Sequence, residues 1–125
     1  MIIGIGTDLV KISRIENSLN RFGESFAKRI LTTDEFQIFL QHKNQATYLA
    51  SRFAVKEAFV KALGTGFTQG LRFSHIGVAN NKEGKPELVF SDKADLLVKE
   101  KKIRSSHLSI THEKDYALAF VVLES

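Results

Sequence analysis

The chain has 125 residues, of which 43% are hydrophobic and 26% charged, proportions that are ordinary for a globular protein with a hydrophobic core. There is no cysteine, so disulfide bonds, thiolate metal sites and a cysteine nucleophile are excluded. The 18 Lys and Arg residues exceed the 14 Asp and Glu residues, and the net charge of +4 favours acidic partners: nucleic acid, a phosphorylated small molecule or an acidic protein.

The length of the chain and the distribution of its apolar residues predict how many domains it has and where in the cell it lies. Its length predicts a single domain covering residues 1–125. The N-terminal segment has no basic region, and Asp8 interrupts its apolar run too early for a signal peptide. The longest apolar run, residues 116–123, is far shorter than the roughly 20 residues of a membrane span. We therefore expect a cytoplasmic protein without a membrane partner.

The first third of the chain predicts one strand followed by short helices. Residues 1–10 are apolar and β-branched, and the alternation of a strand places Gly4, Gly6 and Asp8 on one face, where the glycines leave space for another backbone or a ligand. Ser13 with Glu16 forms a capping-box pattern that predicts a helix from about residue 14 to residue 22. Two further short helices are expected over residues 24–31 and, after N-cap residues at 32–35, to residue 41.

Residues 48–63 predict the central helix. They contain good helix formers and no proline, and Gly64 suits the left-handed position that follows a helix end. At about 100° per residue, apolar side chains surround the axis, which is typical of a buried helix. Nevertheless the segment contains four charged residues, and charges in apolar surroundings need partners or a function. These residues are Arg52, Lys56, Glu57 and Lys61.

The second half of the chain predicts a loop, a hairpin, a helix and two closing strands. The glycine-rich residues 64–73 lack periodicity and indicate the loop. Strands are expected over residues 75–79 and 87–90, a helix from residues 91–92 to about residue 102, and strands over 106–112 and 116–123. The last strand is almost continuously apolar, so it is expected to be central. Strands and helices mix without regular alternation, and the predicted fold class is α+β, a small antiparallel sheet packed with helices that include the long buried central helix.

Asp8 and Glu57 are the carboxylates that stand out, because both lie in apolar segments. Two carboxylates with water and a substrate phosphate suit Mg²⁺, and Lys61 lies one helical turn after Glu57. The alternative for Glu57 and Lys61 is a simple ion pair along one helix, which contributes about 0.2–0.5 kcal/mol.

Two other patterns have weaker chemical interpretations. Ser109 and His112 point to opposite faces of a strand, which excludes a hydrolase triad, and a surface histidine is the alternative for His112. The segment around Thr65 and Gly66 could offer backbone N–H groups to phosphate, but a helix cap followed by a turn explains it equally well.

Three blocks in order resemble one family, the holo-acyl-carrier-protein synthases, which are small 4′-phosphopantetheinyl transferases of the short single-repeat class. The blocks are Gly4-Ile5-Gly6-Thr7-Asp8-Leu9-Val10 with Ile15-Glu16, the run from Arg52 to Gly66, and Ser109-Ile110-Thr111-His112-Glu113 with Tyr116-Ala117. The resemblance covers essentially the whole chain.

The resemblance implies an enzyme that transfers 4′-phosphopantetheine from coenzyme A to a serine of apo-acyl carrier protein and releases adenosine 3′,5′-bisphosphate. By the family's pattern, Asp8 and Glu57 hold Mg²⁺ on the pyrophosphate, Lys61 contacts the same group, and Glu57 is a candidate general base. Phosphoryl transfer depends mainly on positioning and charge neutralisation, which these groups supply.

The remaining implied contacts concern the nucleotide and the assembly. Arg52 and His112 would contact the nucleotide phosphates, and Thr65 and Gly66 would line the coenzyme A site. The usual assembly of the family is a homotrimer with the site between subunits, so these residues can come from different chains.

Arg14 and Arg21 are the predicted docking residues for the carrier protein. They lie seven residues apart and therefore share one face of the first helix. The segment 11–29 holds five basic and two acidic residues, which is +3 of the total charge of +4. Acyl carrier proteins are acidic, so the sign is complementary, whereas the alternative is a solvated helix face.

A rival interpretation from another class is a small basic nucleic-acid-binding domain. The net charge and the basic cluster at residues 99–104 favour it. The absence of any known nucleic-acid-binding motif argues against it, and we therefore expect no nucleic-acid partner.

Overall fold

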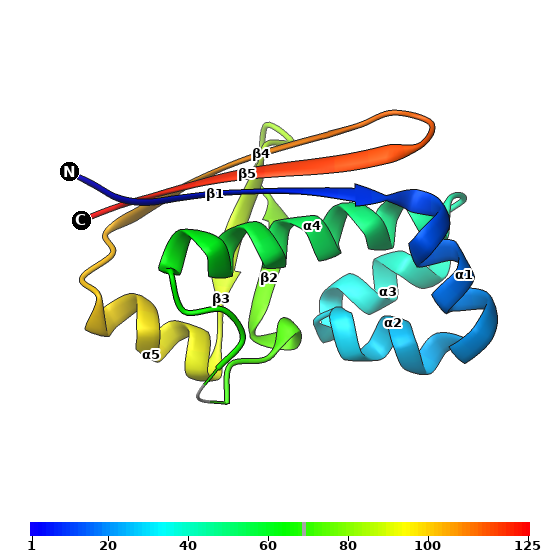
Figure 1. The fold of residues 1–125 in the computed structure, drawn as a ribbon, viewed down its shortest axis with the longest axis horizontal. Helices are drawn as coiled ribbons and strands as arrows, with labels where there is room; N and C mark the ends of the chain where they lie inside the picture. The colour runs from blue at the N-terminus through cyan, green and yellow to red at the C-terminus, as the bar shows by residue number, and fades with distance from the viewer. Residues whose placement is uncertain (69) are drawn as a thin grey trace.

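The computed structural model describes residues 1–68 and 70–125 and has the α+β architecture expected from the sequence (Figure 1). Helix α4 runs along a three-stranded sheet, and the remaining helices lie on the other side of α4. A two-stranded hairpin crosses behind α4 in this view and contacts both α4 and strand β4 of the sheet. The elements in chain order are β1 (Ile2–Lys11), α1 (Ile12–Phe22), α2 (Glu24–Ile30), α3 (Thr33–Gln41), α4 (Gln45–Leu63), a 3₁₀ turn (Phe73–His75), β2 (Ile76–Asn80), β3 (Pro86–Phe90), α5 (Asp92–Glu100), β4 (Ser105–His112) and β5 (Tyr116–Glu124).

The three-stranded sheet has the order β1-β5-β4 and is antiparallel throughout. The prediction that the last strand is central is therefore confirmed. Thr7 of β1 and Ser109 of β4 are both register partners of Phe120 in β5. The two chain termini meet at one end of the sheet, where the N–H of Ser125 donates to the Met1 carbonyl oxygen at 2.9 Å. Strands β2 and β3 form a separate antiparallel hairpin.

The two glycines of β1 allow α4 to lie directly on the sheet. A Cβ atom at Gly4 would lie 2.0 Å from the carbonyl oxygen of Ala62, and one at Gly6 would lie 1.9 Å from that of Ala58. No side chain can be accommodated at these separations without moving the helix backbone. The expectation that the glycines admit another backbone is confirmed, and the close approach places Asp8 beside α4.

Helix α4 lies at the centre of the hydrophobic core, because apolar residues on all its sides are buried against other elements. Leu49, Ala54, Val55, Ala58 and Phe59 have no exposed surface. The Asn44 side chain accepts from Thr47 N–H at the N-terminus, and Gly64 takes the left-handed conformation at the C-terminus, as predicted. The helix begins at Gln45, three residues earlier than the sequence pattern indicated.

The outer face of the sheet, away from α4, carries large exposed apolar side chains. Ile5 is 61% exposed and Leu9 62%, and Ile3 and Phe120 are also exposed, whereas Val10 and Val121 face α4 and are buried.

Among the described helices, none combines the length and the apolar character needed to cross a membrane.

The predicted capping box at Ser13 is wrong. Helix α1 begins at Ile12, directly after β1, and its N-cap residue Lys11 makes no side-chain capping bond. The N–H of Ile12 instead donates to the carbonyl of Asp115 in the β4–β5 turn at 2.9 Å, so tertiary structure satisfies this end of the helix. The corresponding pattern at Thr32 and Glu35 does form a capping box, at the start of α3.

Candidate functional site

Asp8 of β1 and Glu57 of α4 line one pocket, here called the carboxylate pocket, with a volume of about 370 Å³. The glycines of β1 bring the strand against α4, and the alternation of the strand turns Asp8 toward the helix. Other residues that line this pocket are Lys11, Arg14, Phe26 and Phe53. The structure therefore brings together the two carboxylates singled out from the sequence.

The electrostatics of this pocket disfavour the charged form of Glu57. Burial raises the pKa of its carboxyl group, the negative charge of Asp8 raises that pKa further, and the positive charge of Lys61 partly offsets both effects. Two neighbouring carboxylates in a partly desolvated pocket repel each other, and a cation between them would relieve the repulsion.

Lys61 contributes its charge through direct contacts with Thr7 and Asp8. Its ammonium group donates to the carbonyl oxygen of Thr7 at 3.0 Å and to Oδ1 of Asp8 at 3.1 Å. The lysine thus bonds to β1, and the alternative of an ion pair with Glu57 along the helix does not describe its contacts. The Lys61 side chain is 53% exposed, so it remains accessible to a ligand.

Arg52 and His112 line a second pocket of about 330 Å³, here called the Arg52 pocket. The Arg52 guanidinium lies over the Tyr48 ring, 4.5 Å from its centroid, and the His42 ring is 5.1 Å from that ring. Nε of Arg52 and the hydroxyl of Tyr48 are buried, and neither has a hydrogen-bond partner within the described part of the chain. Burial raises the pKa of the Tyr48 hydroxyl, and the Arg52 charge partly offsets this effect. A cationic group with unused donors suits an anionic ligand.

Helix geometry explains why the predicted site residues fall into two pockets. Arg52 and Glu57 are five residues apart on α4, so their side chains leave the helix about 140° apart around its axis. One chain therefore does not bring Arg52 and His112 together with Asp8 and Glu57. Thr65 and Gly66 lie in the turn after α4, where the Thr65 hydroxyl donates to the Gly66 carbonyl at 3.1 Å. Neither residue lines these two pockets in the described structure.

The two predicted docking residues lie on the exposed side of α1. Arg14 is exposed and lines the carboxylate pocket, whereas Arg21 lies further along the helix with its guanidinium 5.1 Å from the Phe22 ring. Because α1 follows β1 directly, it places the basic residue Arg14 next to Asp8 and Glu57.

The carboxylate pocket fits Mg²⁺ by the chemistry of its donors. Mg²⁺ is usually bound by one or two carboxylates and completes its coordination with water and substrate phosphates. Within residues 1–68 and 70–125 there is no cluster of three or more His, Asp or Glu side chains able to hold a metal ion by themselves. The pair Asp8 and Glu57 would therefore hold the ion together with the substrate.

Sequence reasoning missed an apolar cavity of about 740 Å³ that shares Phe26 and Phe53 with the carboxylate pocket. Phe73 stacks on Phe53 with 5.3 Å between the ring centroids and on Phe67 with 4.0 Å. These three rings come from α4, the loop after it and the 3₁₀ turn, and no sequence pattern connects them.

Comparison with known proteins agrees with the resemblance found in the sequence blocks. A profile of the 4′-phosphopantetheinyl transferase superfamily matches residues 4–121. The chain belongs to this superfamily, and the expectation that it is an enzyme of this kind is confirmed.

Three similar proteins within the superfamily are called holo-acyl-carrier-protein synthases. A protein of Nitrosococcus oceani called holo-[acyl-carrier-protein] synthase is 52% identical over 123 residues, which are 98% of this chain and 80% of the relative. The crystal structure of holo-[acyl-carrier-protein] synthase from Neisseria meningitidis is 44% identical and covers all of both chains with a TM-score of 0.95. The holo-(acyl-carrier-protein) synthase from Bacillus anthracis, solved in complex with CoA (3′,5′-ADP), is 40% identical, covers 100% of this chain and 98% of that chain, and has a TM-score of 0.83.

Proposed function

We propose that residues 1–125 form one catalytic domain that transfers the 4′-phosphopantetheine group of coenzyme A to a serine of apo-acyl carrier protein in the cytoplasm. The observation that carries the proposal is the carboxylate pocket, in which Asp8 and Glu57 meet beside Lys61 in a chain of the 4′-phosphopantetheinyl transferase superfamily. The relative from Bacillus anthracis was solved with coenzyme A, which supports the same substrate here.

Mg²⁺ is the proposed cofactor, held by Asp8 and Glu57. When bound, the ion would neutralise charge on the diphosphate of coenzyme A. The raised pKa of the Glu57 carboxyl supports this assignment, because desolvation and the Asp8 charge make an added cation favourable there.

In the proposed reaction, the carrier-protein serine attacks the phosphorus that bears pantetheine. The bond from that phosphorus to the bridging oxygen breaks, and adenosine 3′,5′-bisphosphate leaves with the bonding electrons. Glu57, directly or through a water molecule, accepts the serine proton. The Lys61 ammonium, already 3.1 Å from Asp8, would hold the diphosphate and stabilise the charge on the leaving oxygen.

The nucleotide contacts are proposed to come from the Arg52 pocket of a neighbouring subunit. Arg52 and His112 would bind the phosphates of the nucleotide, and Thr65 and Gly66 would line the coenzyme A site. A homotrimer with sites between subunits would unite the two pockets that one chain keeps apart. The exposed apolar outer face of the sheet supports such an assembly, because contiguous exposed apolar surface often marks an interface.

Arg14 and Arg21 are proposed to dock the acidic carrier protein. Their charges would accelerate association and orient the partner more than they would stabilise the complex. Exchanging both for glutamate (Arg14→Glu with Arg21→Glu) should raise the KM for carrier protein severalfold or more, while the KM for coenzyme A stays near its wild-type value. The wild-type rate should also fall as salt rises, because surface charges are screened. An unchanged KM for carrier protein would move the docking surface elsewhere.

Mass spectrometry of apo-acyl carrier protein, incubated with this protein, Mg²⁺ and coenzyme A, tests the proposal. A mass gain of one phosphopantetheine group is expected, and it should disappear when EDTA is added. No mass gain, together with salt-sensitive binding of RNA, would support the nucleic-acid-binding alternative instead.

A further inference from the structure

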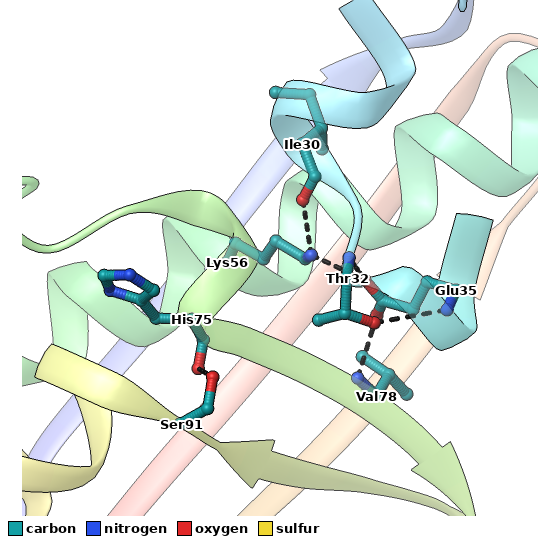
Figure 2. Close-up of polar contacts among 7 residues, drawn as sticks. All are labelled: Ile30, Thr32, Glu35, Lys56, His75, Val78 and Ser91. Carbon is teal, nitrogen blue, oxygen red and sulfur yellow. Dashed lines mark hydrogen bonds and ion pairs between the residues drawn. The ribbon is translucent and has the colours of Figure 1, made fainter.

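Lys56 and Glu35 form a buried ion pair that the proposed reaction does not use. Lys56 of α4 is 0% exposed and Glu35 of α3 is 1% exposed. Their closest approach is 2.6 Å between Nζ of the lysine and Oε1 of the carboxylate, and Nζ also donates to the carbonyl oxygen of Ile30 at 2.5 Å. Figure 2 shows the ammonium group between these two acceptors.

The pair connects four elements of the fold. Oε1 of Glu35 also accepts from the N–H of Thr32 at 2.9 Å, and Oε2 accepts from the N–H of Val78 at 2.9 Å (Figure 2). The C-terminal end of α2, the start of α3, helix α4 and strand β2 therefore meet at one lysine and one glutamate. Each charged group also accepts or donates hydrogen bonds beyond the pair itself, as is usual for buried polar groups.

Stability alone does not account for such a pair. Removing two ions from water is costly, and apolar residues of similar size often stabilise a protein as well or better. A buried pair does, however, select one arrangement of the elements that it joins, because any shift leaves a charge without its partner.

Helix α4 needs a contact that selects one rotation about its own axis. Apolar side chains, many of them alanines, surround its axis, so hydrophobic burial only weakly favours one rotation over another. The contact of Ala58 with Gly6 limits the rotation on the sheet side. The bonds of Lys56 limit it on the side of α2, α3 and β2. Glu57 follows Lys56 by about 100° around the axis, so a rotation that moves one side chain moves the other.

We propose that the Lys56–Glu35 pair is a positioning device that sets the rotation of α4 and thereby directs the Glu57 carboxylate into the carboxylate pocket. This inference rests on the proposed function, in which Glu57 acts on the substrate. Ile30 ends α2, which also supplies Phe26 to the same pocket, so the pair holds two walls of the pocket in register. Lys56 and Glu35 themselves lie outside the pocket lining.

The test is Lys56→Met, which keeps most of the side-chain volume and removes the charge, with Lys99→Met as the matched control. Lys99 pairs with Asp95 on the surface of α5 at 2.8 Å, and its side chain is 72% exposed. Folded fraction is measured by circular dichroism, and kinetics are measured well below the unfolding transition.

In Lys56→Met we expect kcat to fall on the order of tenfold to a hundredfold, because displaced catalytic groups lose rate steeply. The KM for coenzyme A should change by less than about threefold, because its nucleotide contacts are proposed to lie elsewhere. Lys99→Met should match wild type.

Lys56→Gln is the second variant, because an amide can still donate to the Ile30 carbonyl. Its kcat should lie between those of wild type and Lys56→Met. The proposal is overturned if Lys56→Met is folded with a wild-type kcat, if only its KM changes, or if its activity falls only in proportion to its folded fraction. It is also overturned if neither variant folds, because the pair would then maintain the fold as a whole.

A crystal structure of Lys56→Met provides a readout that does not depend on activity. A Glu57 carboxylate turned from its wild-type direction supports the positioning role, and an unmoved carboxylate overturns it. Wild-type protein that transfers no phosphopantetheine would instead refute the proposed function, so the two failures are distinguishable.

Discussion

Helix α4 carries two lysines, five residues apart, that each pair with a carboxylate from another element. Lys56 and Glu35 are 0% and 1% exposed and lie 2.6 Å apart, whereas Lys61 and Asp8 are 53% and 15% exposed and lie 3.1 Å apart. Each ammonium group also donates to one backbone carbonyl, that of Ile30 in the buried pair and that of Thr7 in the exposed pair. The two pairs use the same bonding pattern and differ in their access to solvent.

This difference separates a structural role from a chemical one. Burial lowers the pKa of the Lys56 ammonium, and the Glu35 charge partly offsets that effect, so this lysine depends on its partner to remain charged. The Lys61 side chain is exposed beside Asp8, so it is accessible to the phosphate groups that the proposed reaction brings there. The same two residue types on one helix are thus buried at one position, where the pair joins packed elements, and accessible to solvent at the other, where substrate binding is proposed.

The largest expected effect is on stability. Lys56→Ala leaves the Glu35 carboxylate buried without its cation, and breaking a buried pair in this way typically costs about 3–5 kcal/mol. Lys61→Ala removes an exposed pair, which typically contributes less than about 1 kcal/mol. Urea unfolding followed by circular dichroism measures both free energies. Equal losses in the two variants would show that burial does not distinguish the pairs.

The next largest effect is on catalysis. Asp8→Asn and Glu57→Gln keep the size of each side chain and remove one charge of the proposed metal site. Transfer activity should fall on the order of a hundredfold to a thousandfold, as when a main electrostatic contact is lost. The unfolding free energy of Glu57→Gln should not decrease, because this change relieves repulsion between the carboxylates. That of Asp8→Asn should change by less than about 1 kcal/mol, because the relief is offset by the weakened contact with Lys61. Carrier-protein modification followed by mass spectrometry gives the rates, and near-normal activity of Glu57→Gln at modest Mg²⁺ would contradict the assignment.

A smaller effect is expected for Lys61→Ala on the reaction. A hydrogen bond to a charged group contributes about 1.5–3 kcal/mol, so turnover should fall by about tenfold to a hundredfold. The dependence on Mg²⁺ concentration should change little, because the carboxylates remain. Steady-state kinetics over a range of Mg²⁺ concentrations separate the two effects. A large increase in the Mg²⁺ requirement, with kcat unchanged, would assign Lys61 to the metal site instead.

The smallest effect is on proton binding. The raised pKa of the Glu57 carboxyl results first from burial and then from the Asp8 charge, so Asp8→Asn should lower that pKa toward the ordinary value for glutamate. A carboxyl group with a raised folded-state pKa contributes stability below its unfolded value of about 4.3, and the contribution is lost as pH rises through the folded value. This loss should therefore be smaller in Asp8→Asn.

Carbon-13 NMR of the Glu57 carboxyl group measures the pKa in both proteins directly, and urea unfolding at acidic and neutral pH measures the linked stability. An unchanged pKa in Asp8→Asn would mean that burial alone raises it and that the two carboxylates do not interact.

Most predictions that came from local patterns, apart from the capping box at Ser13, were confirmed to within a few residues. The alternation of the first strand and its two glycines indicated space for another backbone or a ligand, which the structure fills with α4, and Thr32 with Glu35 indicated the start of α3. Continuous apolar character indicated that β5 is central. Such features depend on side-chain chemistry and spacing within one segment, and a sequence displays both. The ordered motif blocks also led to the right superfamily.

The tertiary structure alone decided which charged groups meet. The sequence marked the four charges of α4 as unusual, but the partner of Lys56 lies in α3 and the partner of Lys61 lies in β1. The Ser13 capping box failed for the same reason, since a distant carbonyl at Asp115 satisfies the first N–H of α1. Contacts between elements depend on how the elements pack and on which groups that packing removes from water, and neither is a property of a single segment.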